Sequence, residues 1–211
     1  MNSKTRNFIL NWGAISAAAY VAFQLIANVL STKIALLPGL NWAIDGGTII
    51  YPLTFTVRDF VHKTLGKKAA RQIVITAAIL NLVMVALFWL IGKMTPDASW
   101  PFQEAYQQIL LPVWRIVIAS IVAQVISELI DTEIFSWAYK KFNDVLAVLF
   151  SNSIALVIDS IIFSLIAFTG SLPFSVVLQI IYTNIIIKML LSIISLPTIK
   201  AVPRKVEFEE I

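Results

Sequence analysis

The chain has 211 residues, of which 59% are hydrophobic and only 13% are charged, and its formal net charge is +4. Because a soluble domain carries about 25% charged residues, this composition excludes an ordinary soluble domain and indicates one integral membrane domain over residues 1–211. The lack of cysteine excludes disulfides, thiolate metal sites and a cysteine nucleophile, and a single histidine cannot form a histidine-rich metal site. We therefore expect no metal and no cofactor.

Six segments are long and apolar enough to cross a bilayer as helices, which takes about 20 residues each. The second segment is the least regular, because Pro52, Arg58 and Asp59 interrupt it. Gly46 and Gly47 near its start predict a broken outer end, which a bilayer tolerates only where the break is buried or lines a cavity. The six predicted spans are 8–30, 47–65, 73–91, 113–137, 145–168 and 174–196.

The lysines and arginines outside these spans are distributed unevenly between the two sides of the membrane. Eleven fall on the side of the two termini, counting Lys63 at the end of the second span, whereas only Lys33 and Lys93 fall on the other. Because positively charged loops stay in the cytoplasm, we expect both termini there, and this topology explains the net charge better than nucleic-acid binding does. The sequence thus predicts an all-α membrane protein with six transmembrane helices, in which a 3+3 repeat would be inverted.

Two further segments each allow two structures. The outer loop 95–111 mixes aromatic and polar residues, and it forms either a short amphipathic helix along the membrane surface or an irregular loop. Ala14, Ala18 and Ala22 form a stripe of small residues on the first span, a pattern that is typical of helix packing. This stripe either packs inside the chain or docks against another subunit.

Charged and amide side chains inside the predicted spans are the most informative feature of the chain. Each charge costs roughly 2.5–3.5 kcal/mol at the centre of a membrane helix, so several are retained only where they face one another or a wet cavity. On the fourth span the polar residues recur at i, i+3, i+4 and i+7, which places them on one helix face. The polar residues within spans are Asn28, Arg58, Asp59, Arg115, Gln124, Ser127, Glu128, Asp131, Asn152, Asp159, Asn184 and Lys188.

The predicted orientation places most of these side chains near one depth on four helices, with Arg115 nearer to the outer end of its span. Structural ion pairs, such as Arg58 with Asp159 or Lys188 with Asp59, are one explanation. A cavity that binds a polar ligand is the other. The uncharged amides favour the cavity, since one or two ion pairs suffice to hold helices together and transporters bind their substrates near mid-membrane.

The chain lacks GxxxxGK[ST], GxSxG and HExxH, the motifs of P-loop nucleotide binding, serine hydrolases and zinc proteases. It therefore cannot hydrolyse ATP by itself. A membrane-embedded enzyme stays an alternative to a transporter, because Glu128 and Asp131 are suited to acid–base chemistry. Their spacing of one helical turn suits hydrogen bonds to a ligand equally well.

Three runs of sequence resemble one known family. They are GGTIIYPLTFTVRDFVHKTLGKKAAR (46–71), RIVIASIVAQVISELIDTEIF (115–135) and SNSIALVIDSIIF (151–163), and the segment 184–188 continues the match. These runs resemble the queuosine precursor transporter family, also called the vitamin uptake transporter (VUT) family. The resemblance covers essentially the whole chain and implies six spans and uptake of 7-deazaguanine precursors of queuosine, such as 7-cyano- or 7-aminomethyl-7-deazaguanine or queuine, across the bacterial cytoplasmic (inner) membrane.

The resemblance also implies a set of binding residues. Two positions depart from the family pattern, because Glu128 stands where the family often has Gln and Asn184 stands where some relatives carry Asp. Such an exchange of carboxylate and amide bears on which precursor is accepted. The recurring polar positions of the family fall on Asn28, Asp59, Arg115, Gln124, Asp131, Asn152, Asp159 and Lys188.

The implied ligand presents an N–H and an NH₂ side by side on its guanine-like edge, which one carboxylate accepts in a bidentate hydrogen bond. An amide or a cation would donate to the ring carbonyl, and an aromatic ring would stack on the flat face. Transport would follow alternating access, coupled to protons through Asp59, Asp131 or Asp159 or driven by metabolic trapping. The residues suited to these roles are Glu128, Asp131 or Asp159 as acceptor, Gln124, Asn152 or Lys188 as donor, and Tyr51, Phe55 or Phe163 for stacking.

The expected partners are a nucleobase-like small molecule and the lipid bilayer, with no nucleic acid. The oligomeric state stays open, and a homo-oligomer is compatible with the sequence. A second kind of transporter is the substrate-binding subunit of an energy-coupling-factor importer, which docks an ATPase module through small residues. The stripe Ala14, Ala18 and Ala22 keeps this alternative open.

Overall fold

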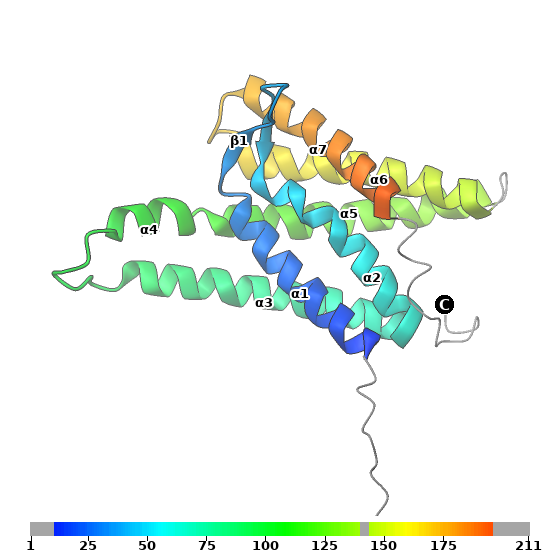
Figure 1. The fold of residues 1–211 in the computed structure, drawn as a ribbon, viewed down its shortest axis with the longest axis horizontal. Coiled ribbons are helices and arrows are strands. Elements are labelled where there is room, and N and C mark those ends of the chain that lie inside the picture. Colours follow the sequence, from blue (N-terminus) through cyan, green and yellow to red (C-terminus); the bar gives the residue numbers. More distant parts are fainter. Residues whose placement is uncertain (1–10, 140–143, 196–211) are drawn as a thin grey trace, which may run out of the picture.

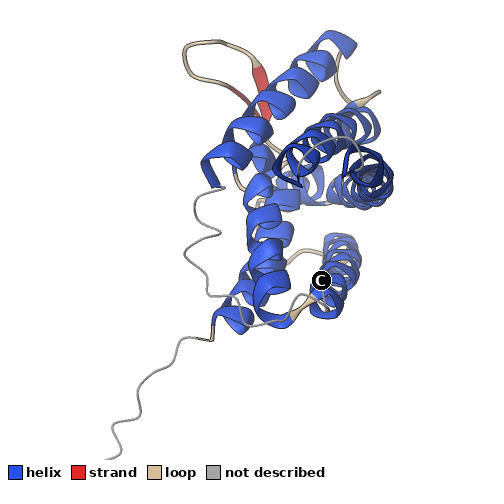
Figure 2. Cartoon of the chain, turned by 90° about the vertical axis from the view of Figure 1, so that its right-hand side faces the viewer, coloured by secondary structure: helices blue, strands red, loops and turns tan. Residues whose placement is uncertain are grey.

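The computed structural model describes residues 11–139 and 144–195, and helices make up most of that part of the chain (Figure 1). An antiparallel hairpin of two short strands follows the first helix, with Ile34 opposite Asp45. Figure 2 shows that these strands lie at one end of an otherwise helical molecule. In chain order the elements are α1 (Trp12–Leu30), β1 (Ile34–Leu36), β2 (Ala43–Asp45), the 3-10 helix η1 (Gly46–Ile49), α2 (Tyr51–Leu65), α3 (Lys67–Lys93), α4 (Gln103–Leu110), α5 (Val113–Tyr139), α6 (Asp144–Phe168) and α7 (Phe174–Ser195).

The predicted spans match these helices to within a few residues, except for the second and third. The second span starts as η1 and continues as α2, which confirms the predicted break at its glycines. The third helix begins at Lys67 instead of residue 73, because Gly66 alone makes the turn from α2 with a φ of 87°, a conformation that glycine adopts without strain. Residues 8–10 and 196, at the ends of two predicted spans, lie outside the described residues.

The segment between α3 and α5 contains the helix α4, so of the two structures expected for residues 95–111 the structure has the helix. The side-chain amides of Gln103 and Gln107 donate to the backbone carbonyl of Gly92 at 3.0 and 2.6 Å. This carbonyl belongs to the last turn of α3, where carbonyl groups have no partner within the helix. The two hydrogen bonds therefore hold α4 against the end of α3.

Four helical stretches of the described chain are long and apolar enough to cross a membrane by length and composition. They are Trp12–Leu30, Lys68–Lys93, Gln103–Ser127 and Phe174–Ile194. Helix α2, with 15 residues, is too short to cross a membrane by this measure. The apolar stretch Ser153–Phe168 of α6 is also too short. The chain is thus an all-α, multi-pass membrane-type protein.

The apolar core lies where α5, α6 and α7 pack together. It is built from small residues on α5, Ala119 and Ala123, against larger ones such as Phe163 and Ile180 on the other two helices. Because alanine has no side chain beyond Cβ, the helix axes can approach closely, as is common between membrane helices. Ala43 of β2 is part of the same core, so strand β2 is buried in the end of the bundle, whereas β1 is partly exposed and residues 38–42 between the strands are exposed.

Large apolar side chains cover the outside of the molecule, most densely on α3, where Ile75, Ile79, Leu87 and Trp89 are all more than half exposed. Lipid tails solvate such a surface as well as a protein interior does. The alanine stripe of α1 is also exposed at each of its three positions, 14, 18 and 22. Of the two alternatives for this stripe, packing inside the chain therefore disagrees with the structure, and docking against another subunit stays a prediction.

Candidate functional site

A small pocket, with a cavity volume of about 20 Å³, lies among the C-terminal end of α1, the segment β2–η1, and helices α2, α5, α6 and α7. This volume is enough for about one water molecule, which needs roughly 10–15 Å³, so a larger ligand would enter only when the surrounding helices separate. Its lining mixes carboxylates, amides, hydroxyls, one ammonium group and two aromatic rings. The lining residues are Ala27, Asn28, Ser31, Asp45, Gly47, Thr48, Tyr51, Ser120, Asp159, Phe163, Asn184 and Lys188.

Asp45 is the most fully hydrogen-bonded carboxyl group of the pocket. Its Oδ1 accepts from the Ser31 hydroxyl at 2.8 Å and from the Gly47 amide at 3.1 Å. Its Oδ2 lies 2.7 Å from the Thr48 hydroxyl and accepts from the Asn184 side-chain amide at 2.8 Å. The side chain is 1% exposed. Asp45 thus connects the hairpin to α1 and to α7 through neutral donors.

Two glycines bring this segment close enough to α1 for those bonds to form. A Cβ atom on Gly46 would lie 2.5 Å from the Leu30 carbonyl oxygen, and one on Gly47 would lie 2.1 Å from the Ser31 hydroxyl. Contacts of that length do not occur between real Cβ atoms and their neighbours. Only glycine therefore allows η1 to pack against the last turn of α1, and this packing buries the polar groups of Asp45 and Thr48 inside the bundle.

Asp159 and Lys188 form a buried ion pair across α6 and α7. The Lys188 Nζ lies 2.7 Å from Asp159 Oδ2, and both side chains are 3% exposed. The same ammonium lies 4.8 Å from the ring centroid of Tyr51 and 5.8 Å from that of Phe163, distances at which a cation is attracted to the ring face. The Oδ1 atom of Asp159 has no hydrogen bond to any residue that the structure describes.

Buried polar residues also follow one face of α1 in steps of four residues. Asn28 donates to Asn81 of α3 at 2.7 Å. One turn earlier, Gln24 donates to the Tyr20 hydroxyl at 3.2 Å, and Gln124 of α5 donates to the same hydroxyl at 3.3 Å. This face of α1 therefore continues the polar lining of the pocket along the helix toward its N-terminus.

Arg115 lies at the start of α5 and binds the end of α6. Its Nε donates to the carbonyl of Ile166 at 2.6 Å, one Nη donates to the Ser171 hydroxyl at 2.9 Å, and the other Nη donates to the carbonyl of Thr169. The last carbonyls of a helix lack partners within it and carry partial negative charge. The guanidinium supplies both the donors and the positive charge.

Four of the ten residues predicted for the site line this pocket together, namely Asn28, Asp159, Asn184 and Lys188. Lys188 pairs with Asp159, so the two ion pairs considered from the sequence are replaced by a third. Of the other predicted site residues, Asp59, Arg115 and Gln124 are described but are not among the lining residues. The side chains of Glu128, Asp131 and Asn152 lie outside the described part of the chain.

The prediction from sequence missed Asp45, Ser31 and Thr48. A signal was present, because Asp45 directly precedes two glycines and caps η1 by accepting from the Gly47 amide, a position at which aspartate is favoured. Tyr51 and Phe163, named from sequence as stacking candidates, both line the pocket.

The comparisons with known proteins agree with this description. The model of the family described as "Putative vitamin uptake transporter" matches residues 45–202. A relative from Bacillus subtilis (strain 168), "Probable queuosine precursor transporter", is 26% identical over 208 residues, which cover 96% of this chain and 90% of the relative. No solved structure matches. Since the family match spans more than half of the chain and the resemblance seen in its motifs is thereby confirmed, the chain belongs to the vitamin uptake transporter family.

Proposed function

We propose that this protein takes up queuosine precursors across the bacterial cytoplasmic membrane by alternating access around the pocket beneath the hairpin. The substrates are 7-deazaguanines such as 7-cyano- or 7-aminomethyl-7-deazaguanine, or queuine. The observation that carries the proposal is a pocket of charged, amide and aromatic residues buried inside an apolar helical bundle. The name of the Bacillus relative supports this substrate class.

The free oxygen of Asp159 and the neighbouring ammonium suit the edge of a guanine-like base. Asp159 Oδ1 would accept an N–H of the base, and Lys188 would donate to the ring carbonyl while keeping its bond to Oδ2. The Tyr51 and Phe163 rings lie close to the Lys188 ammonium, and a flat heterocycle can stack on such rings. The site would thus recognise the ligand by polar contacts and by shape.

We propose six transmembrane helices, with α2 and α6 adding to the four stretches named above, and with both termini in the cytoplasm. The 11 basic residues on the side of the termini, against Lys33 and Lys93 on the other, support this orientation. The pocket then lies nearer to the outer face, where the hairpin closes it. The buried polar face of α1, through Gln24 and Tyr20, would form the route to the cytoplasm.

Uptake of radiolabelled 7-aminomethyl-7-deazaguanine in cells that cannot synthesise queuosine tests the proposal. We expect Asp159→Asn to lower the apparent affinity about 10- to 100-fold, because a hydrogen bond to a charged group contributes about 1.5–3 kcal/mol. The single variant leaves Lys188 without its counter-ion, so the double variant Asp159→Asn, Lys188→Met restores neutrality and serves as the folding control. Wild-type uptake by a double variant that reaches the membrane would overturn the site.

A second candidate function is that of a substrate-binding subunit, which binds the same ligand but needs a partner ATPase for transport. A groove between α1 and α3 is lined by Ala17, Ala18 and Ala22, as a docking surface for the ATPase module of an energy-coupling-factor importer would be. Uptake by the purified chain alone, reconstituted in liposomes, would exclude any need for that module. Conversion of the ligand by the purified protein would instead support a membrane-embedded enzyme.

A further inference from the structure

Three side chains in the wall of the pocket form a closed triangle of short contacts. Thr48 Oγ1 lies 2.7 Å from Asp45 Oδ2 and 2.5 Å from Asn184 Oδ1, and Asn184 Nδ2 lies 2.8 Å from the same Asp45 oxygen. The three residues come from η1, the end of β2 and the middle of α7. None is more than 2% exposed, so bulk water does not complete their hydrogen bonds.

An ionised Asp45 leaves this triangle one proton short. The Thr48 hydroxyl has a single hydrogen, so it donates to Asp45 or to Asn184 but not to both. The remaining pair of oxygens then faces each other at 2.5 or 2.7 Å with no hydrogen between them. The oxygen and nitrogen of the Asn184 amide look alike in most structures. Exchanging them still leaves two oxygens without a hydrogen between them, because the amide oxygen then faces Asp45 Oδ2 at 2.8 Å.

A proton on Oδ2 of Asp45 removes the conflict. The acid hydroxyl donates to Thr48, the Thr48 hydroxyl donates to the Asn184 carbonyl oxygen, and the Asn184 NH₂ donates back to Asp45 Oδ2. Each of the three contacts then has one hydrogen, at lengths normal for such bonds. The Oδ1 atom, as the carbonyl oxygen of the acid, accepts from the Ser31 hydroxyl and the Gly47 amide.

The charges around the triangle agree with a neutral Asp45. The titratable groups that share the pocket are Tyr51 on α2, Asp159 on α6 and Lys188 on α7. Lys188 forms its salt bridge with Asp159, and no cation of the described chain pairs with Asp45. Lys33, which precedes β1, is exposed and contributes only its backbone carbonyl to this region. An ionised carboxylate without a cation is costly inside a membrane protein.

We propose that Asp45 is a proton-binding site whose loading and release drive the uptake cycle. The second half of this statement rests on the proposed function. With the proton bound, Asp45 holds the hairpin to α1 and α7, as described. When the proton leaves toward the cytoplasm, the carboxylate repels the Asn184 oxygen and the contact to α7 opens. A proton from outside then re-forms the acid, so one proton enters with each cycle and no bond other than this O–H is made or broken.

Infrared spectroscopy of the purified protein in lipid vesicles tests proton binding without any ligand. We expect a carbonyl-stretch band of a protonated carboxylic acid at pH 7 that is lost in Asp45→Asn. Asp97→Asn is the matched control, because hydrogen bonds from the Ser99 hydroxyl and backbone amide keep the pKa of the exposed Asp97 below its ordinary value. Asp97 therefore contributes no such band. An Asp45→Asn spectrum with the band unchanged would refute the site.

Thr48→Val supplies a second variant with nearly the same shape. Without the hydroxyl, an ionised Asp45 meets only donors, from Ser31, Gly47 and Asn184. We therefore expect the carboxylic acid band to disappear at a lower pH than in the wild type. A band that titrates at the wild-type pH would show that the triangle does not hold the proton.

Proteoliposomes separate this inference from the proposed function. With the outside made acidic, we expect the wild type to accumulate labelled 7-aminomethyl-7-deazaguanine and to acidify the lumen. In Asp45→Asn or Thr48→Val, we expect the ratio of uptake with the pH gradient to uptake without it to fall to one. Wild-type uptake that ignores the gradient overturns the coupling and leaves the substrate assignment standing. Absence of wild-type uptake, together with an Asp45-dependent infrared band, overturns the substrate assignment and leaves the proton site standing.

Discussion

Two aspartates in one pocket are accommodated in opposite ways. Asp159 is neutralised by the ammonium of Lys188 at 2.7 Å, whereas Asp45 is surrounded by hydroxyl and amide donors. The ion pair uses Oδ2 of Asp159 and leaves Oδ1 without a hydrogen bond from the residues that the structure describes, as the proposed contact with a ligand requires. Hydrogen bonds to neutral groups allow Asp45 to gain and lose a proton without leaving a cation unpaired. The two carboxyl groups are therefore suited to different tasks, ligand binding and proton binding.

The close approach at Gly47 should be sensitive to a single methyl group. We expect Gly47→Ala to destabilise the protein by about 1–3 kcal/mol, the usual cost of overpacking, because the new Cβ would meet the Ser31 hydroxyl at 2.1 Å and the Ala27 carbonyl at 2.6 Å. Thermal unfolding in detergent measures the loss. Gly92→Ala is the control, since its Cβ would meet the movable Leu111 side chain at 2.9 Å. Equal melting temperatures for the two variants would contradict this account.

The predicted residues that line the pocket and the lining residues that the prediction missed differ in their position along the sequence. Asn28, Asp159, Asn184 and Lys188 interrupt apolar runs, and a polar group inside such a run needs a partner. Asp45 stands in a polar segment between spans, where aspartate is ordinarily solvated. Its burial depends on packing of η1 against α1, a tertiary contact that no local pattern of the sequence expresses.

At the level of elements, the turn from α6 to α7 depends on a residue of α5. Arg115→Met removes all three hydrogen bonds to this turn, and we expect a loss of about 1–2 kcal/mol, since hydrogen bonds to charged groups contribute about 1.5–3 kcal/mol and this side chain is half-exposed. The melting temperature in detergent should fall accordingly. Arg115→Lys should recover only part of it, because an ammonium lacks the guanidinium fork.

Uptake by the same Arg115 variants distinguishes a role in the fold from a role in ligand binding. A variant that melts at the wild-type temperature but has lost uptake would place Arg115 among the ligand-binding residues, as the family resemblance implies. Lowered stability with a normal apparent affinity would assign the guanidinium to the end of α6, where the structure has its three acceptors.

The helices themselves were predictable, and the connections between them were less so. Runs of about 20 apolar residues predict the positions of α1, α5, α6 and α7 to within a few residues, because the bilayer thickness sets the length of such runs. The hairpin is different, since β1 and β2 are three residues each. Strands that short carry no periodic signal, and they exist here because α7 and the bundle end provide a surface for Ala43 and Ile44.

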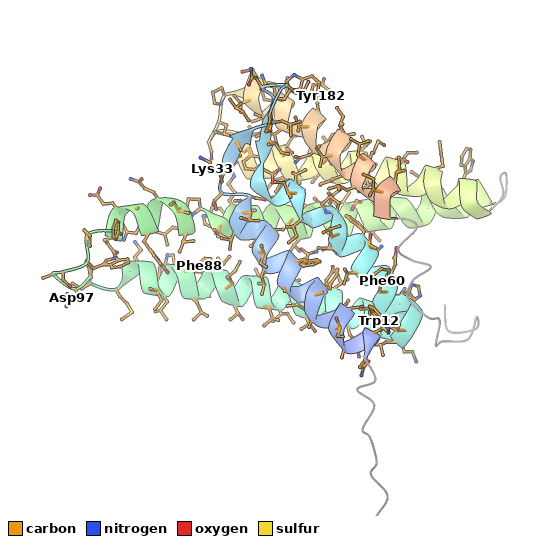
Figure 3. All side chains as sticks on the ribbon, viewed as in Figure 1. Trp12, Lys33, Phe60, Phe88, Asp97 and Tyr182 are labelled. Carbon is orange, nitrogen blue, oxygen red and sulfur yellow. The ribbon has the colours of Figure 1, made fainter. Side chains whose placement is uncertain are left out.

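On the scale of the whole molecule, polar groups are gathered at the centre and apolar side chains cover the outside. Asp97 lies at one extremity, at the tip of the loop between α3 and α4, and Trp12 lies toward the opposite end, where α5 and α6 extend farther (Figure 3). The long axis between them follows the direction of α3 (Figure 1). A bilayer crossed along this axis would leave the α3–α4 loop on one side and the α2–α3 turn on the other.

This arrangement makes the topology measurable, because the natural chain has no cysteine. We expect Asp97→Cys to react with a membrane-impermeant maleimide in intact cells, since the loop with few basic residues is external. Lys68→Cys, near the start of α3 and exposed, should react only after the membrane is permeabilised. The wild-type chain is the blank in both assays. Labelling of the residue 68 variant but not the residue 97 variant in intact cells would invert the orientation, and the proton at Asp45 would then be loaded from the cytoplasmic side.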